Sequence, residues 1–138
     1  MRRIAALLLL VMADQAAIAA APVWNSHPRL ACKTEYVRAC ELTAKQKCLK
    51  KESTASFVFD FRSSVMQNNA NGRRYRILSQ VYKNVTDPSG DVNTVFISTG
   101  SMVSFLPMDP RQPRAVKAVS YSPNAQVAGY GSLICRPA

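Results

Sequence analysis

The sequence predicts a mainly β protein, a small antiparallel β-sandwich or barrel preceded by a short cysteine-bearing helical segment. Three observations lead to this class. Short segments with alternating apolar residues recur from residue 55 onward, turn-forming residues separate them, and residues 31–52 are instead rich in Lys, Glu, Ala and Gln. Short strands at regular spacing are typical of sandwiches and barrels, whereas those four residue types favour helix. A chain of 138 residues is short enough for one domain.

Residues 1–19 have the layout of a secretory signal peptide. Two arginines open the chain, an unbroken apolar stretch covers residues 4–12, and small residues at Ala17 and Ala19 allow cleavage after Ala19. A membrane anchor would need about 20 apolar residues, but Asp14 and Gln15 interrupt this stretch. We therefore expect residues 1–19 to be removed, with no transmembrane segment after cleavage and a periplasmic or secreted mature protein.

The remaining chain divides into a lead-in and a β domain. Residues 20–52 are expected to form an extended lead-in followed by a short helix, because Thr43 and Gln46 fit a capping box that opens a helix through Lys51. Residues 53–138 are expected to form the β domain, and the globular unit as a whole is expected to cover residues 31–138.

Six strands are predicted from alternation. In the first of them Phe57, Phe59 and Phe61 share one face, and in the second Tyr75, Ile77 and Val81 oppose Arg76, Gln80 and Asn84. The six cover residues 55–65, 75–85, 92–98, 102–106, 116–121 and 126–135. Between them we expect turns at 68–72 and 87–91, a hairpin at 99–101 and a proline-rich loop at 107–113. Gly129 and Gly131 in the last strand indicate a bulge, a close backbone approach or a ligand touching the sheet.

The four cysteines are an even set on a chain expected to be exported, which predicts two disulfides. Any pairing of all four joins Cys135 to one of Cys32, Cys40 and Cys48 and closes a loop of roughly 90 to 100 residues, a constraint of about 4 to 5 kcal/mol. Three pairings stay open. On one continuous helix the α-carbons of Cys40 and Cys48 would be about 12 Å apart, which is too far for a disulfide. Either the helix begins after Cys40, or these two do not pair.

No motif for catalysis or metal binding is visible. The amino-terminal cysteines are separated by seven residues, twice, unlike the close pairs of zinc sites. The lone histidine, His27, lies in the irregular lead-in, where nothing would orient it as a base for a nucleophile. Carboxylates are few and fall mostly in turns or in the cysteine-bearing segment, so a pair for acid–base work is not evident. We expect no enzyme activity, no cofactor and no metal.

The charge of the chain indicates its partners. There are 18 Lys and Arg against 8 Asp and Glu, a net charge of +10, and removal of residues 1–19 leaves about +9. Outside the cytoplasm the available polyanions are lipid head groups, lipopolysaccharide and cell-wall polymers, so nucleic acid is not the expected partner. The expected anion-binding residues form three groups along the chain: Lys45, Lys47, Lys50 and Lys51; Arg73, Arg74 and Arg76; and Arg111, Arg114 and Lys117.

Two functions of different classes follow. The leading hypothesis is an exported, non-enzymatic envelope protein that binds an anionic surface or partner through these clusters, with Tyr36, Tyr75 and Tyr82 available for cation–π contacts. The simpler interpretation of the same charges is a solvated surface that maintains solubility. The alternative function is an inhibitor or accessory subunit that binds one specific protein through an apolar patch and loops such as 107–113. The sequence does not give the oligomeric state.

Overall fold

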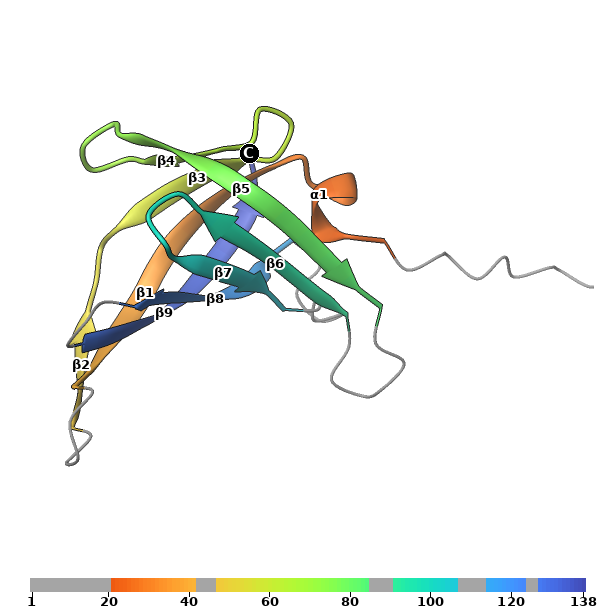
Figure 1. The fold of residues 1–138 in the computed structure, drawn as a ribbon. Coiled ribbons are helices and arrows are strands. Elements are labelled where there is room, and N and C mark those ends of the chain that lie inside the picture. The colour runs from red at the N-terminus through yellow and green to blue at the C-terminus, as the bar shows by residue number, and fades with distance from the viewer. Residues whose placement is uncertain (1–20, 42–46, 85–90, 107–113, 124–126) are drawn as a thin grey trace, which may run out of the picture.

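The protein is a closed eight-strand antiparallel β-barrel with one additional strand (Figure 1). The computed structural model describes residues 21–41, 47–84, 91–106, 114–123 and 127–138. The elements in chain order are α1 (Val23–Ser26), β1 (Arg29–Glu41), β2 (Cys48–Glu52), β3 (Ser56–Asp60), β4 (Val65–Asn68), β5 (Arg74–Lys83), β6 (Val92–Ile97), β7 (Met102–Phe105), β8 (Val116–Pro123) and β9 (Val127–Pro137). Within this part of the chain no helix is long and apolar enough to cross a membrane.

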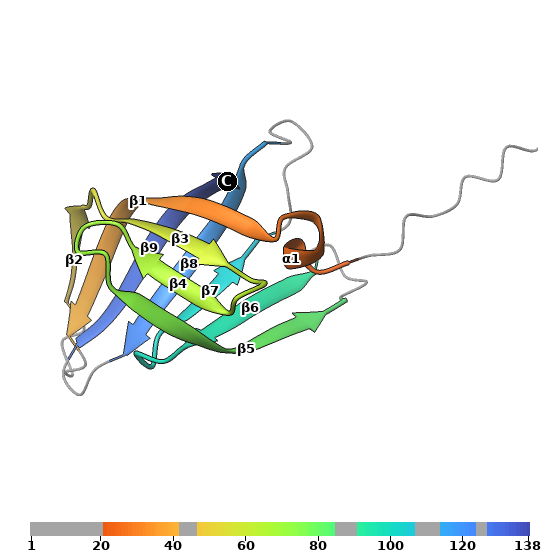
Figure 2. The same cartoon turned by 90° about the horizontal axis from the view of Figure 1, so that it is seen from above.

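The barrel closes because β1 pairs with both β3 and β9. From β3 to β9 each strand pairs with the next along the chain, and β1 joins the two ends of that series. Figure 2 shows β3 and β4 lying over β8 and β9. Strand β2 is the additional one, and it pairs with the part of β1 that extends beyond β3. The sequence predicted either a sandwich or a barrel, and the pairing of the first and last strands makes the fold a barrel.

The core is the barrel interior. Phe59 and Phe105 are almost fully buried, and their rings meet edge to face at 5.5 Å, while Phe61 lies 5.7 Å from Phe105. The alternation of Phe57, Phe59 and Phe61 therefore predicted the inward face of β3 correctly. The predicted strand 55–65 is instead two strands, because a turn at residues 61–64 separates β3 from β4, and Ser64 adopts a left-handed conformation with φ of 53°.

The segment before β1 closes one end of the barrel. It was expected to be extended, but residues 23–26 form the short helical turn α1. The Trp24 ring lies 5.9 Å from that of Phe61, and the Val23 N–H donates to Asn93 Oδ1 at 2.8 Å. Both Val23 and Trp24 pack against the core. We call this the α1 end, and the opposite end, which carries the β4–β5 and β6–β7 hairpins, the open end.

The expected short helix through Lys51 is not confirmed. Residues 42–46 lie outside the described residues, and residues 48–52 form strand β2. The preceding helix-forming stretch is also strand, since β1 runs to Glu41 with Leu30, Cys32 and Thr34 buried at alternate positions. Helix propensity differs among ordinary residues by at most about 0.7 kcal/mol, and the pairing of β1 with three other strands outweighs it.

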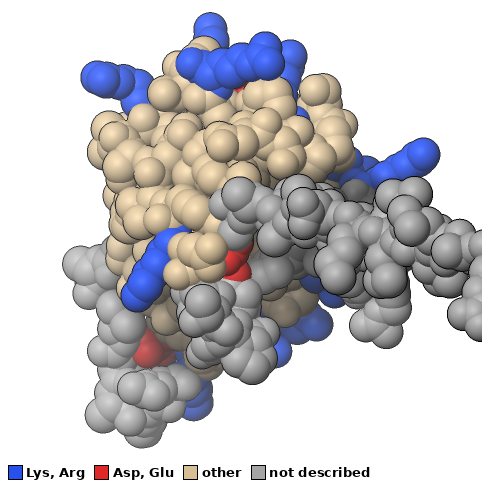
Figure 3. All heavy atoms as spheres, turned by 90° about the vertical axis from the view of Figure 1, so that its right-hand side faces the viewer, with Lys and Arg blue, Asp and Glu red and all other residues tan. Residues whose placement is uncertain are grey.

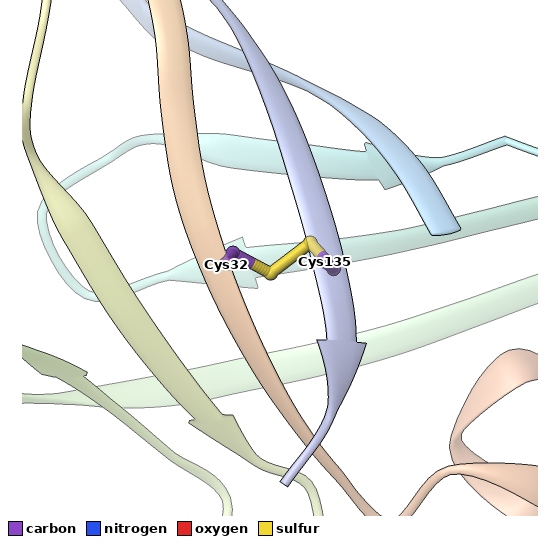
Figure 4. The surroundings of a disulfide bond; sticks show 2 residues. All are labelled: Cys32 and Cys135. Carbon is purple, nitrogen blue, oxygen red and sulfur yellow. A yellow bond between two sulfur atoms is a disulfide. The ribbon is translucent and has the colours of Figure 1, made fainter. Parts of the chain in front are cut away.

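Both disulfides join residues that face each other directly across paired strands. Cys32 on β1 is bonded to Cys135 on β9, inside the barrel (Figure 4), with α-carbons 3.9 Å apart. Cys40 on β1 is bonded to Cys48 on β2, with α-carbons 4.0 Å apart. The 12 Å separation that a continuous helix would impose does not arise, because these two cysteines lie on antiparallel strands.

Two register irregularities change which residues face inward. The first falls at Glu35 on β1, and the second at Leu78 on β5, whose side chain is exposed. An extra residue in one strand reverses the alternation beyond it. Beyond Leu78, Gln80 is half-buried and Val81 is exposed, so the predicted faces for these two residues were wrong.

Close approach explains one of the two β9 glycines, Gly131, whereas a Cβ at Gly129 would make only ordinary van der Waals contact. The bulge opposite β9 lies on β1, and the pairing of β9 is regular at both glycines. A Cβ at Gly131 would collide with the Ser120 hydroxyl on β8.

The hairpin at 99–101 forms as predicted, with the Ile97 N–H donating to the Ser101 carbonyl. The loop 107–113 and most of the turn 87–91 lie outside the described residues.

Candidate functional site

The three predicted basic groups lie on different parts of the barrel. Lys47, Lys50 and Lys51 are exposed in and beside β2, and Arg73, Arg74 and Arg76 are exposed at the β4–β5 hairpin, so both groups belong to the open end. Arg114 and Lys117 are exposed at the start of β8, which is at the α1 end. Lys45 and Arg111 lie outside the described residues.

The basic residues therefore form a distributed surface. Figure 3 views the barrel from the α1 end and shows lysines and arginines at several separated places around a broad uncharged area. Lys50 and Lys51 are neighbours in sequence but project from opposite faces of β2, as alternation in a strand requires. The structure separates residues that the sequence grouped and brings others together.

The tightest grouping of cations is around Tyr36. The Lys50 ammonium lies 4.4 Å from the centre of the Tyr36 ring, and the Arg38 guanidinium carbon lies 5.9 Å from it. Arg38 and Lys50 are directly opposite one another in the β1–β2 pairing. Arg38 was not among the predicted site residues. The two-residue spacing of Tyr36 and Arg38 would have identified it only if this segment had been recognised as a strand.

An aromatic row continues from these cations across the outside of the barrel. We use the name aromatic row for Tyr130, Tyr121, Met102 and Phe96, which face one another in successive strand pairs from β9 to β6, with Arg38 opposite Tyr130. The two tyrosine rings are 5.2 Å apart, and Tyr130 and Phe96 are each at least 40% exposed. Exposed aromatic residues in a contiguous patch are typical of interaction surfaces.

Two hollows lie along this row. One, of about 400 Å³, is bordered by Tyr36, Arg38, the Cys40–Cys48 bridge and Tyr130. The second, of about 350 Å³, is bordered by Met102, Tyr121 and again Tyr130. The two hollows are neighbours, because Val119 and Tyr130 border both of them.

A larger hollow of about 610 Å³ lies beside the β1 bulge. Its borders carry both signs of charge, from Lys33 and Arg136 on one side and Glu35 and Glu52 on the other. Glu35 Oε2 accepts a hydrogen bond of 2.9 Å from the Ser132 hydroxyl. The opposed charges favour neither an anion nor a cation, so this hollow is a weaker candidate despite its size.

The fourth hollow lies inside the barrel at the open end. It has a volume of about 220 Å³ and is lined by residues of β3 to β9 and of the β6–β7 hairpin. Its walls are apolar, with Phe59, Ile97 and Leu133 among them, and hydroxyl groups are contributed by Thr99, Ser101, Ser120 and Ser122.

Titratable groups give no acid–base pair within the described residues. The backbone N–H of Ser63, which donates to Asp60 Oδ1 at 3.1 Å, lowers the pKa of this carboxyl. Desolvation raises the pKa of Tyr82, and a hydrogen bond of 2.9 Å to Asp91 adds to the effect. Neither group borders the hollows. In the same part of the chain no three His, Cys, Asp or Glu residues are grouped as a metal site would require.

Comparison with protein families, with curated proteins and with solved structures finds no significant match. The function is therefore argued from this chain's own residues.

Proposed function

We propose that this protein is an exported, non-enzymatic envelope protein that binds an anionic surface or partner through its lysine and arginine side chains. The observation that carries the proposal is the state of these cations. The described members of the three basic groups are exposed, and no ion pair neutralises them within the described chain. Together with a net charge of +10, they leave a positive surface available to polyanions.

The open end carries most of the described residues of the three basic groups. It carries Arg73, Arg74 and Arg76 on one hairpin, and Lys50 beside Arg38 around Tyr36. The oxidised state fits an export compartment, because two disulfides in a small domain are typical of the periplasm and the extracellular space. Lipid head groups, lipopolysaccharide and cell-wall polymers are the polyanions abundant there.

The test is co-sedimentation of the oxidised protein with cell-envelope fractions and with phosphatidylglycerol vesicles at low and high salt. Binding is expected to fall as salt rises, because exposed charge contacts are screened. Each cation near an anionic surface contributes about 1 kcal/mol. Replacing Arg73, Arg74 and Arg76 with Ala should therefore weaken binding roughly 100-fold at low salt.

The matched control removes three other exposed cations, Arg62, Lys83 and Arg136, for the same loss of charge. This variant should bind with less than a 10-fold loss. Equal losses in the two variants would show that net charge alone determines binding. Unchanged binding of the first variant would remove the arginine group from the proposal.

The second candidate is an inhibitor or accessory subunit that binds one specific protein, and the aromatic row favours it. A packed interface persists at high salt. Envelope binding that survives high salt and is lost in Tyr130→Ala would support this function instead of the first.

A further inference from the structure

We infer that the open end of the barrel is a binding site for a compact, uncharged, mainly apolar molecule that carries one hydrogen-bonding group. This inference is independent of the anion-binding function. Eight-strand barrels are just wide enough to be filled by side chains or to hold one small ligand. Here the two ends of the barrel are built differently, and only one of them is filled.

At the α1 end the interior is closed by side chains. Trp24 packs on Phe61, and the Val23 N–H is fixed to Asn93. At the open end, Phe57 is only half-buried and borders the hollow of about 220 Å³. Phe57 and Phe61 are about 13 Å apart along the strand direction at about 3.3 Å per residue. Trp24 and Phe61, which fill the α1 end, do not line this hollow.

The size of the hollow sets the size of the ligand. A cavity of about 150 Å³ lined by apolar side chains holds benzene, and drug-sized pockets begin at about 300 Å³. The volume of this hollow, about 220 Å³, lies between that of a benzene-sized cavity and that of a drug-sized pocket. It fits a single substituted ring or an aliphatic molecule of similar bulk.

The lining sets the charge of the ligand. Its walls are formed by apolar side chains such as Phe59, Met66 and Leu133, and among the described residues no Asp, Glu, Lys, Arg or His borders it. A charged group placed there would lose hydration without a counter-ion, which is strongly unfavourable. The outer cations therefore do not serve this site, and an uncharged ligand is preferred.

Ser120 provides the polar contact. The hydroxyls of Ser101 and Ser122 bond to each other at 2.9 Å, and Thr99 donates to Ser101 at 3.0 Å. Ser120 Oγ has no hydrogen-bond partner within the described chain and is not fully buried. Its position depends on Gly131, where a Cβ would occupy the place of this hydroxyl. A phenol or alcohol group of the ligand can bond to Ser120 while its hydrocarbon part contacts the walls.

The test is an amide NMR titration of the oxidised protein with 4-methylphenol, toluene and benzoate. We expect 4-methylphenol and toluene to cause saturable shifts at Thr99, Ser101 and Ser120 and no shift of the Trp24 indole at the α1 end. Benzoate should cause no such shifts. Ser120→Ala should weaken 4-methylphenol binding about fivefold, the effect of one neutral hydrogen bond, and leave toluene binding unchanged.

A blocking variant and its control complete the experiment. Ser122 is exposed at the rim, so Ser122→Trp should abolish binding of both molecules. Ser63→Trp makes the same change in an exposed turn at the α1 end, and this variant should still bind both molecules. The amide spectra show whether each variant is folded. Absence of saturable shifts up to the solubility of both probes, undiminished binding to Ser122→Trp, or shifts confined to the aromatic row would overturn the inference.

Discussion

The two disulfides offer a comparison within one molecule. Replacing Cys32 and Cys135 with Ala opens a loop of 103 residues, whereas replacing Cys40 and Cys48 opens one of 8 residues. The chain-entropy relation gives about 4.7 kcal/mol for the first constraint and about 2.5 kcal/mol for the second. The expected difference in the free energy of unfolding is therefore about 2 kcal/mol.

Burial increases that difference. Cys32 is 2% exposed and Cys135 is fully buried in the core, whereas Cys48 is exposed. Replacement of the buried pair also removes core atoms and leaves a cavity, which adds to the loss of stability. Replacement of the exposed pair opens little or no cavity at Cys48.

The assay is urea unfolding of the two double variants and the parent protein at one pH and temperature. The Cys40→Ala/Cys48→Ala variant should remain folded with a lower midpoint. The Cys32→Ala/Cys135→Ala variant should lose at least about 2 kcal/mol more, enough to unfold it if the parent is marginally stable. Equal losses, or a larger loss in the Cys40→Ala/Cys48→Ala variant, would refute the conclusion that the Cys32–Cys135 disulfide contributes more to stability.

Two further perturbations test the α1 end. Trp24→Ala should lower the free energy of unfolding, measured in urea, by about 2 kcal/mol. This is less than the roughly 3 to 5 kcal/mol lost on truncating a fully buried Trp, because Trp24 is only half-buried against Phe61. An unchanged unfolding midpoint would show that Trp24 does not close the barrel. The lowered pKa of Asp60 stabilises the folded state above the ordinary value of 3.8, and this contribution is lost as pH falls through the folded pKa. Asp60→Asn should remove that acid dependence, and a parallel pH profile for the two proteins would contradict it.

Sequence alternation identified the strands whose side chains are either plainly inside or plainly outside. The Phe57–Phe59–Phe61 series marked the inner face of β3, and the Thr99–Gly100–Ser101 turn marked the β6–β7 hairpin, whose Gly100 has a φ of 84°. Both signals are local. A turn at Gly100 and a period of two need no information from the rest of the chain.

The parts that sequence could not give depend on distant partners. Residues 31–41 have a composition that favours helix but belong to β1, which pairs with three other strands, and nothing within the segment indicates that pairing. The extra residues at Glu35 and Leu78 are visible only from the opposite strand. Arg38 and Lys50 likewise meet only after β1 and β2 pair, so the cations around Tyr36 were divided between a helix and a lead-in.

The barrel wall separates two chemical environments that the sequence presents as one basic chain. Every cation of the three predicted groups that the structure describes is exposed on the outside, and none borders the interior hollow at the open end. A polyanion and a small neutral molecule would therefore not compete for the same side chains. Loss of Arg73, Arg74 and Arg76 should leave 4-methylphenol binding intact, and Ser120→Ala should leave envelope binding intact. Coupling between the two would require a connection through the β4–β5 hairpin, whose Asn68 borders the hollow and whose Arg73 carbonyl accepts from the Asn68 N–H.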